Sequence, residues 1–102
     1  MSEGTTPVQD PFTARVVVPQ HVVHRSFASE TVVLNLRTGK YHGLNPTAGA
    51  MLEALERSGS ISGASAAVAR RFELPMQTVE DDLRRLCSAL LERDLIELDD
   101  TA

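Results

Sequence analysis

The chain has one cysteine, no tryptophan and no long apolar run, and each shortage excludes something. A single cysteine, Cys87, cannot form an internal disulfide and suits a reducing compartment, so we expect a cytoplasmic protein. No window approaches the roughly 20 apolar residues of a membrane span. The N-terminal stretch also lacks the basic start and apolar core of a secretory signal. We therefore expect no membrane partner.

Positive charge is scarce as well. Ten lysine and arginine residues stand against fourteen aspartate and glutamate residues, which gives a formal net charge of -4. Nucleic-acid binding requires positive charge against phosphates, so this balance argues against a nucleic-acid partner. At 102 residues the chain can fold as one domain with its own core, but it is small for an elaborate active site.

Composition divides the chain into three parts. Residues 1–20 are poor in apolar side chains over most of their length and are expected to form a flexible arm. Within them Val16–Val18 precedes Pro19 and leaves two alternatives open, a transient strand or loose packing. We expect the folded domain to span residues 21–98, with residues 99–102 as a tail.

The first half of this domain predicts a three-stranded antiparallel meander. His21–Phe27 forms the first strand, and apolar Val32, Leu34 and Leu36 alternate with other residues as in a half-buried second strand. A Thr-Gly turn then leads into a short third strand, Tyr41–Leu44. Because a helix starts almost without a loop after the third strand, that strand is expected to keep an open edge, which is either a liability or a binding site.

The second half predicts three helices. Asn45 and Pro46 suit the start of a helix that runs to about residue 57, and a second helix follows over residues 60–72. Leu74-Pro75 ends it, and a third helix covers residues 76–93. The expected fold is α+β and resembles a winged helix-turn-helix. The two periodicities predict a core that includes Val32, Leu34, Leu36, Leu44, Met51, Leu55, Val68, Phe72, Leu83, Leu86 and Leu90.

None of the reactive side chains suggests an enzyme. His21 and His24 lie on opposite faces of a strand, and with His42 they have no partner at metal-site spacing, so we expect no metal and no cofactor. Cys87 falls in the apolar part of the third helix, where a lone cysteine is usually filler. A winged helix can bind DNA through its last helix. Here, however, the start of that helix carries Glu80, Asp81 and Asp82, which phosphates would repel.

The order of these motifs resembles that of the PqqD-like peptide chaperones, also called precursor peptide recognition elements. The resemblance rests on the run VLNLRTGKYHGLN at residues 33–45 and on a last helix with Asp82-Leu83, Leu86-Cys87 and Leu90. Asp94-Leu95-Ile96 follows where the family usually has glycine before two aliphatic residues, and aspartate tolerates the left-handed conformation that this turn needs.

The resemblance implies a non-catalytic module that binds the leader segment of a ribosomally made precursor peptide and delivers it to a modifying enzyme. The leader would add as a fourth strand beside the third strand, against the third helix. The free-standing lasso-peptide type, with a leader peptidase as partner, is favoured. A chaperone for a radical enzyme of the PQQ pathway, a DNA-binding winged helix and a homo-oligomeric adaptor remain alternatives. The expected peptide-binding residues are Lys40, Tyr41, His42, Gly43, Leu44, Val79, Asp82, Leu83, Arg85, Leu86 and Cys87.

Overall fold

A three-stranded antiparallel sheet forms one side of the computed structural model, which describes residues 14–99. Its strands are β2 (Val22–Ser26), β3 (Thr31–Asn35) and β4 (Tyr41–Leu44), in the order β2-β3-β4. The register places Leu34 between Val23 on β2 and Tyr41 on β4. The predicted meander is confirmed, with strand ends that differ from the expected ones by only a residue or two.

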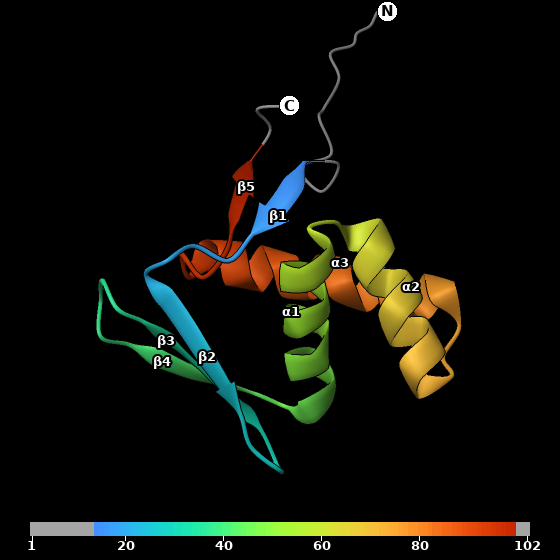
Figure 1. Ribbon diagram of the computed structural model, residues 1–102, viewed down its shortest axis with the longest axis horizontal. Helices are drawn as coiled ribbons and strands as arrows, with labels where there is room; N and C mark the ends of the chain where they lie inside the picture. The colour runs from blue at the N-terminus through green and yellow to red at the C-terminus, as the bar shows by residue number, and fades with distance from the viewer. Residues whose placement is uncertain (1–13, 100–102) are drawn as a thin grey trace, which may run out of the picture.

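Three helices follow without interruption by further strands (Figure 1). They are α1 (Pro46–Ser58), α2 (Ile61–Phe72) and α3 (Met76–Glu92). Asn45 caps α1 by accepting a hydrogen bond from the backbone of Ala48, and Gly59 ends this helix in the left-handed conformation. The expected helices and the α+β, winged-helix-like architecture are therefore confirmed.

A second, two-stranded sheet was not predicted. It pairs β1 (Arg15–Val17) with β5 (Glu97–Asp99) in antiparallel register. The side chain of Val16 is 2% exposed and belongs to the core, and its backbone N–H donates to Gly59 O at 2.9 Å. The structure therefore corrects both expected boundaries. β1 lies within the arm expected over residues 1–20, and β5 includes residue 99 of the tail expected over residues 99–102. Residues 1–13 and 100–102 lie outside the described residues.

The alternation predicted for β3 has the correct period but the wrong phase. Thr31, Val33 and Asn35 face the helices and are buried, whereas Val32 and Leu34 lie on the outer face and are half-buried. Leu36, also predicted to be core, is 56% exposed. A polar residue can occupy the inner face when it finds hydrogen-bond partners, and both polar residues of β3 do.

Those partners join β3 to its surroundings. Thr31 Oγ1 lies 3.0 Å from the hydroxyl of Ser26 on β2. Asn35 Nδ2 donates to the carbonyl of Asp94 at 3.2 Å, beyond the end of α3, while Asn35 Oδ1 accepts from the backbone N–H of Arg37 at 2.9 Å. Buried amide and hydroxyl groups with such partners avoid the cost of unpaired polar burial.

Asp94 links the end of α3 to the sheet. It adopts a left-handed conformation with φ of 59°, as expected for the residue that replaces a glycine of the family. Its carboxylate lies 3.1 Å from His21 Nε2 and 3.3 Å from Arg37 Nη1. The turn after α3 is thereby held against the hairpin end of the three-stranded sheet.

The rest of the predicted core is largely correct. Met51, Leu55, Val68, Leu83 and Leu90 are buried, while Leu44, Phe72 and Leu86 are partly buried against the same cluster. The core also contains buried side chains beyond that predicted set, which come from the helices, from β1, β2 and β3, and from the turn before β5. These are Val16, Val22, Val33, Leu52, Ile61, Ala64, Val79, Cys87, Leu95 and Ile96.

Candidate functional site

The three-stranded sheet has two edge strands, β2 and β4, and β4 is the one that leads directly into α1. Within residues 14–99, β4 pairs only with β3, so one row of its backbone groups has no neighbouring strand. Three hydrogen bonds fix which groups these are. Leu36 N donates to His21 O and Phe27 N to Glu30 O across β2–β3, whereas Asn35 N donates to Lys40 O across β3–β4.

In an antiparallel pair, hydrogen-bonded and non-hydrogen-bonded positions alternate. The bond from Asn35 to Lys40 therefore makes Val33–His42 and Thr31–Leu44 the bonded pairs between β3 and β4. Backbone groups of His42 and Leu44 point inward to β3. Those of Tyr41 and Gly43 point outward, and together they offer two donors and two acceptors at the edge.

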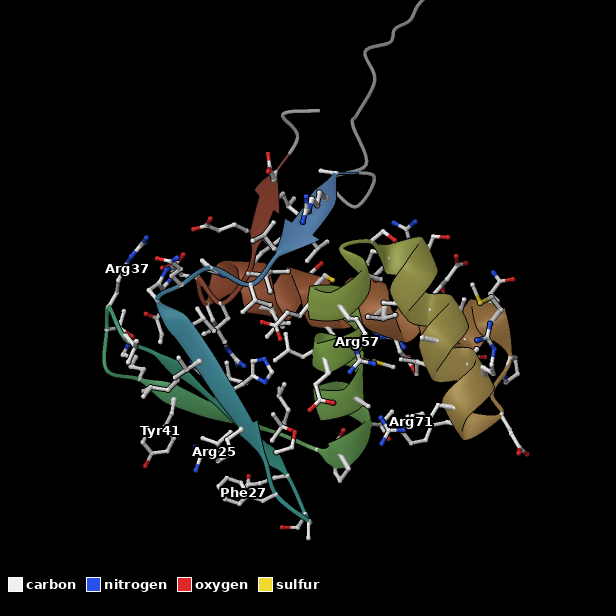
Figure 2. All side chains as sticks on the ribbon, in the orientation of Figure 1. Arg25, Phe27, Arg37, Tyr41, Arg57 and Arg71 are labelled. Carbon is white, nitrogen blue, oxygen red and sulfur yellow. The ribbon has the colours of Figure 1, made fainter. Side chains whose placement is uncertain are left out.

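The side chains of β4 follow the same alternation. Tyr41 is 72% exposed on the outer face and therefore does not belong to the core. Figure 2 shows it on the side of the sheet that also carries Arg25 and Phe27, away from the helices. His42 and Leu44 are half-buried on the inner face, and Lys40 is exposed just before the strand begins.

A hollow of about 390 Å³ lies beside this edge, between the start of α1 and α3. Asn45, Thr47, Ala48 and Met51 form one wall, directly after β4, and α3 contributes the other. We call this hollow the β4–α3 groove because Asn45 directly follows β4; the residues that line it lie at the start of α1 and on α3. Sequence reasoning missed the α1 wall, although the helix start at Pro46 and the spacing of Ala48 and Met51 on one helix face were the signals that could have revealed it.

On α3 the structure separates the predicted site residues into two groups. Asp82 and Leu86 are half-buried and line the β4–α3 groove, and exposed Arg85 forms an ion pair with Asp82. By contrast, the side chains of Val79, Leu83 and Cys87 are fully buried in the core. These three side chains pack α3 against the core and do not reach the surface of the groove.

Cys87 has no reactive character in this position. Burial raises the pKa of its thiol to about 11, with Arg84 acting in the opposite direction. A neutral, buried thiol is neither a nucleophile nor a metal ligand. Among residues 14–99 no three His, Cys, Asp or Glu side chains come together as a metal site, and no helix there has the length and apolar character to cross a membrane.

The profile of the family described as Coenzyme PQQ synthesis protein D (PqqD) matches residues 30–96, from the turn before β3 to the start of β5. The chain belongs to the PqqD family. This match spans well over half of the 102 residues and includes both β4 and the α3 wall of the groove. The resemblance inferred from the motifs is confirmed.

Two solved structures are similar to this PqqD-family chain. "TbiB1 in Complex with the TbiA(beta) Leader Peptide" has 30% sequence identity to this chain and a TM-score of 0.71. The match covers 79% of this chain and 94% of the TbiB1 chain. "Lasso peptide synthetase B1 complexed with the leader peptide" has 21% identity and a TM-score of 0.71, and covers 82% and 99% respectively. The second likeness concerns the fold alone. A comparison with curated proteins gives no significant match.

Proposed function

We propose that this chain binds the leader segment of a ribosomally made precursor peptide, by strand addition to β4, and presents it to a modifying enzyme. The observation that carries the proposal is the outward row of backbone groups at Tyr41 and Gly43, next to the β4–α3 groove. Main-chain hydrogen bonds supply affinity in this mode of recognition, and pockets for alternate side chains supply specificity.

The groove has polar residues at its border and can accept an apolar side chain of the ligand. Half-buried Ala48 and Leu86 provide apolar surface above the buried Met51, and Asn45 and Asp82 provide a comparable amount of polar surface. An added strand that pairs through Tyr41 and Gly43 turns every second side chain toward this groove. Asp82, Arg85 and Lys40 would then orient the peptide, and the buried apolar contact would contribute more of the binding energy.

The solved structure of TbiB1 contains a leader peptide, and the similarity to it supports a leader peptide as the ligand. For the pathway we favour lasso peptide biosynthesis, with a leader peptidase as the enzyme partner, as the motif resemblance implies. The name of the matching family supports a second candidate, a peptide chaperone of the PQQ pathway that serves a radical enzyme. Both candidates use the same peptide-binding edge, and in both the chain itself performs no catalysis.

The binding step can be tested by titration and by amide chemical shifts. The probes are the TbiA(beta) leader peptide and the leader of any short precursor peptide that a gene next to this chain's gene encodes. We expect saturable binding, with the largest shifts at the backbone amides of Tyr41 and Gly43. Absence of binding by both peptides would rule out the proposal, and binding with shifts confined to α2 would rule out the β4 edge as the site.

A further inference from the structure

A carboxylate lies over the free edge strand. Glu30 directly precedes β3 and, two residues before Val32, shares its outer face by the alternation of the strand. A β-carbon built on Gly43 of β4 would lie 2.7 Å from Glu30 Oε1. The Glu30 side chain thus occupies the space that any other residue at position 43 would fill.

Glu30 has no ion-pair partner among the described residues. Ion pairs join His21 and Arg37 to Asp94, His24 to Glu56 and Arg85 to Asp82, and Glu30 takes part in none of these pairs of the described residues. Arg25 is on the same outer face, but it lies on β2, with Val32 between it and Gly43. The carboxylate therefore lies over β4, on the side of the sheet that ends in the open edge.

Gly43 is also one of the two residues whose backbone groups point outward. A ligand residue that pairs with Gly43 would place its β-carbon about 4.5–5.5 Å from the β-carbon position of residue 43. On the outer face that residue's side chain would meet the Glu30 carboxylate, because Gly43 has no side chain to intervene. Lysine and arginine side chains are long enough to reach it.

We infer that Glu30 selects a lysine or arginine at the ligand position that pairs with Gly43. This inference rests on the proposed strand addition. An aspartate or glutamate there would face a like charge. This recognition is separate from the apolar contact in the β4–α3 groove, because the two involve opposite faces of the added strand. Gly43 has a double role: its backbone pairs with the peptide and its missing side chain admits the carboxylate.

The test is a charge-swap titration with whichever of the two leader peptides named above binds the wild-type chain. Each peptide position whose side chain can lie on the outer face of the sheet is replaced in turn by lysine, alanine and glutamate. Each peptide is then titrated against the wild-type chain, Glu30→Gln and Glu30→Lys. At one position, lysine should strengthen binding to wild type over alanine by about two- to fivefold, as for an exposed ion pair. Glu30→Lys should reverse this preference, Glu30→Gln should remove it, and high salt should weaken it.

Glu97→Lys is the matched control, because it changes the net charge equally on β5, in the other sheet. It should leave the lysine preference unchanged. If the wild-type chain binds no leader peptide, both the proposed function and this inference fail. If it binds, but no peptide position reverses its charge preference with Glu30→Lys relative to Glu97→Lys, the inference alone is wrong.

Discussion

Gly49 of α1 lies directly against Thr31 of β3, so closely that a β-carbon on Gly49 would be 2.7 Å from Thr31 Cβ and closer still to its hydroxyl. This contact sets the distance between the helix and the sheet. Alanine in a helix interior is normally favoured over glycine by about 1 kcal/mol. Gly49→Ala should instead destabilise the chain by about 1–3 kcal/mol, because the extra methyl group overpacks the site.

Urea unfolding of four chains measures this effect: wild type, Gly49→Ala, Thr31→Ala and the double variant. Thr31→Ala removes the hydroxyl and one methyl group, so the cost of Gly49→Ala should fall in that background. Equal costs in both backgrounds would contradict the close contact.

Proline substitutions distinguish the two sides of β4. Tyr41→Pro removes an outward N–H and should weaken leader-peptide binding by about tenfold or more while the chain stays folded, since proline is tolerated on edge strands. His42→Pro removes an inward N–H and should lower the free energy of unfolding by about 1–3 kcal/mol. Titration and urea unfolding measure the two effects, and Tyr41→Ala, which keeps the N–H, is the control. If Tyr41→Pro binds the leader as tightly as Tyr41→Ala, pairing at this edge is wrong.

Two leucines of α3 should separate stability from binding. Leu83 is fully buried, so Leu83→Ala should cost about 2–5 kcal/mol of unfolding free energy. Leu86 is half-buried in the β4–α3 groove, so Leu86→Ala should cost less stability but weaken peptide binding. Comparing unfolding and titration for both variants tests this, and a Leu86→Ala chain with unchanged affinity would exclude the groove as a side-chain pocket.

The buried thiol gives the stability a pH dependence. The pKa of Cys87 rises from 9.0 to about 11 in the folded chain, so the unfolded chain releases this proton first as pH rises. The contribution of Cys87 is complete below pH 9 and is lost as pH rises toward 11. Urea unfolding at pH 8 and pH 10 should show a larger loss for wild type than for Cys87→Ala, and parallel losses would contradict the shift.

Truncation tests the N-terminal boundary. Removal of residues 1–13 is expected to leave leader affinity and stability unchanged, because their composition cannot support a packed core. Removal through Val17 should destabilise the chain, because it deletes β1 and the buried side chain of Val16. A tenfold loss of affinity for the shorter deletion would make those residues part of the site.

Local patterns predicted most of the fold because each element carries its own signal. Asn45 and Ser60 each precede a helix and cap it, and the strand alternation was visible at its correct period. The phase of β3 was not predictable from hydrophobicity, since Thr31 and Asn35 are buried through hydrogen bonds to Ser26 and Asp94, and these partners appear only in the folded chain. The β1–β5 pairing was missed because it joins segments from opposite ends of the sequence.

The candidate site was predictable in outline only. A strand that passes directly into a helix indicated the open edge, but the direction of each amide depends on the register with β3, which fixes Tyr41 and Gly43 as outward. On α3, a helical repeat does not say which side chains are covered by α1 and α2. Thus Leu86 lines the groove while Cys87, its neighbour in sequence, does not.

The antiparallel pairing of β1 with β5 has a consequence for how this domain can be joined to others. It brings the two ends of the described chain side by side, and Figure 1 shows β1 and β5 together at the top of the molecule, with the β2–β3 turn at the bottom. Chain termini that lie close together favour domain insertion and circular permutation. A purification tag, a fluorescent protein or an entire enzyme could therefore be fused at either end without covering the edge of β4.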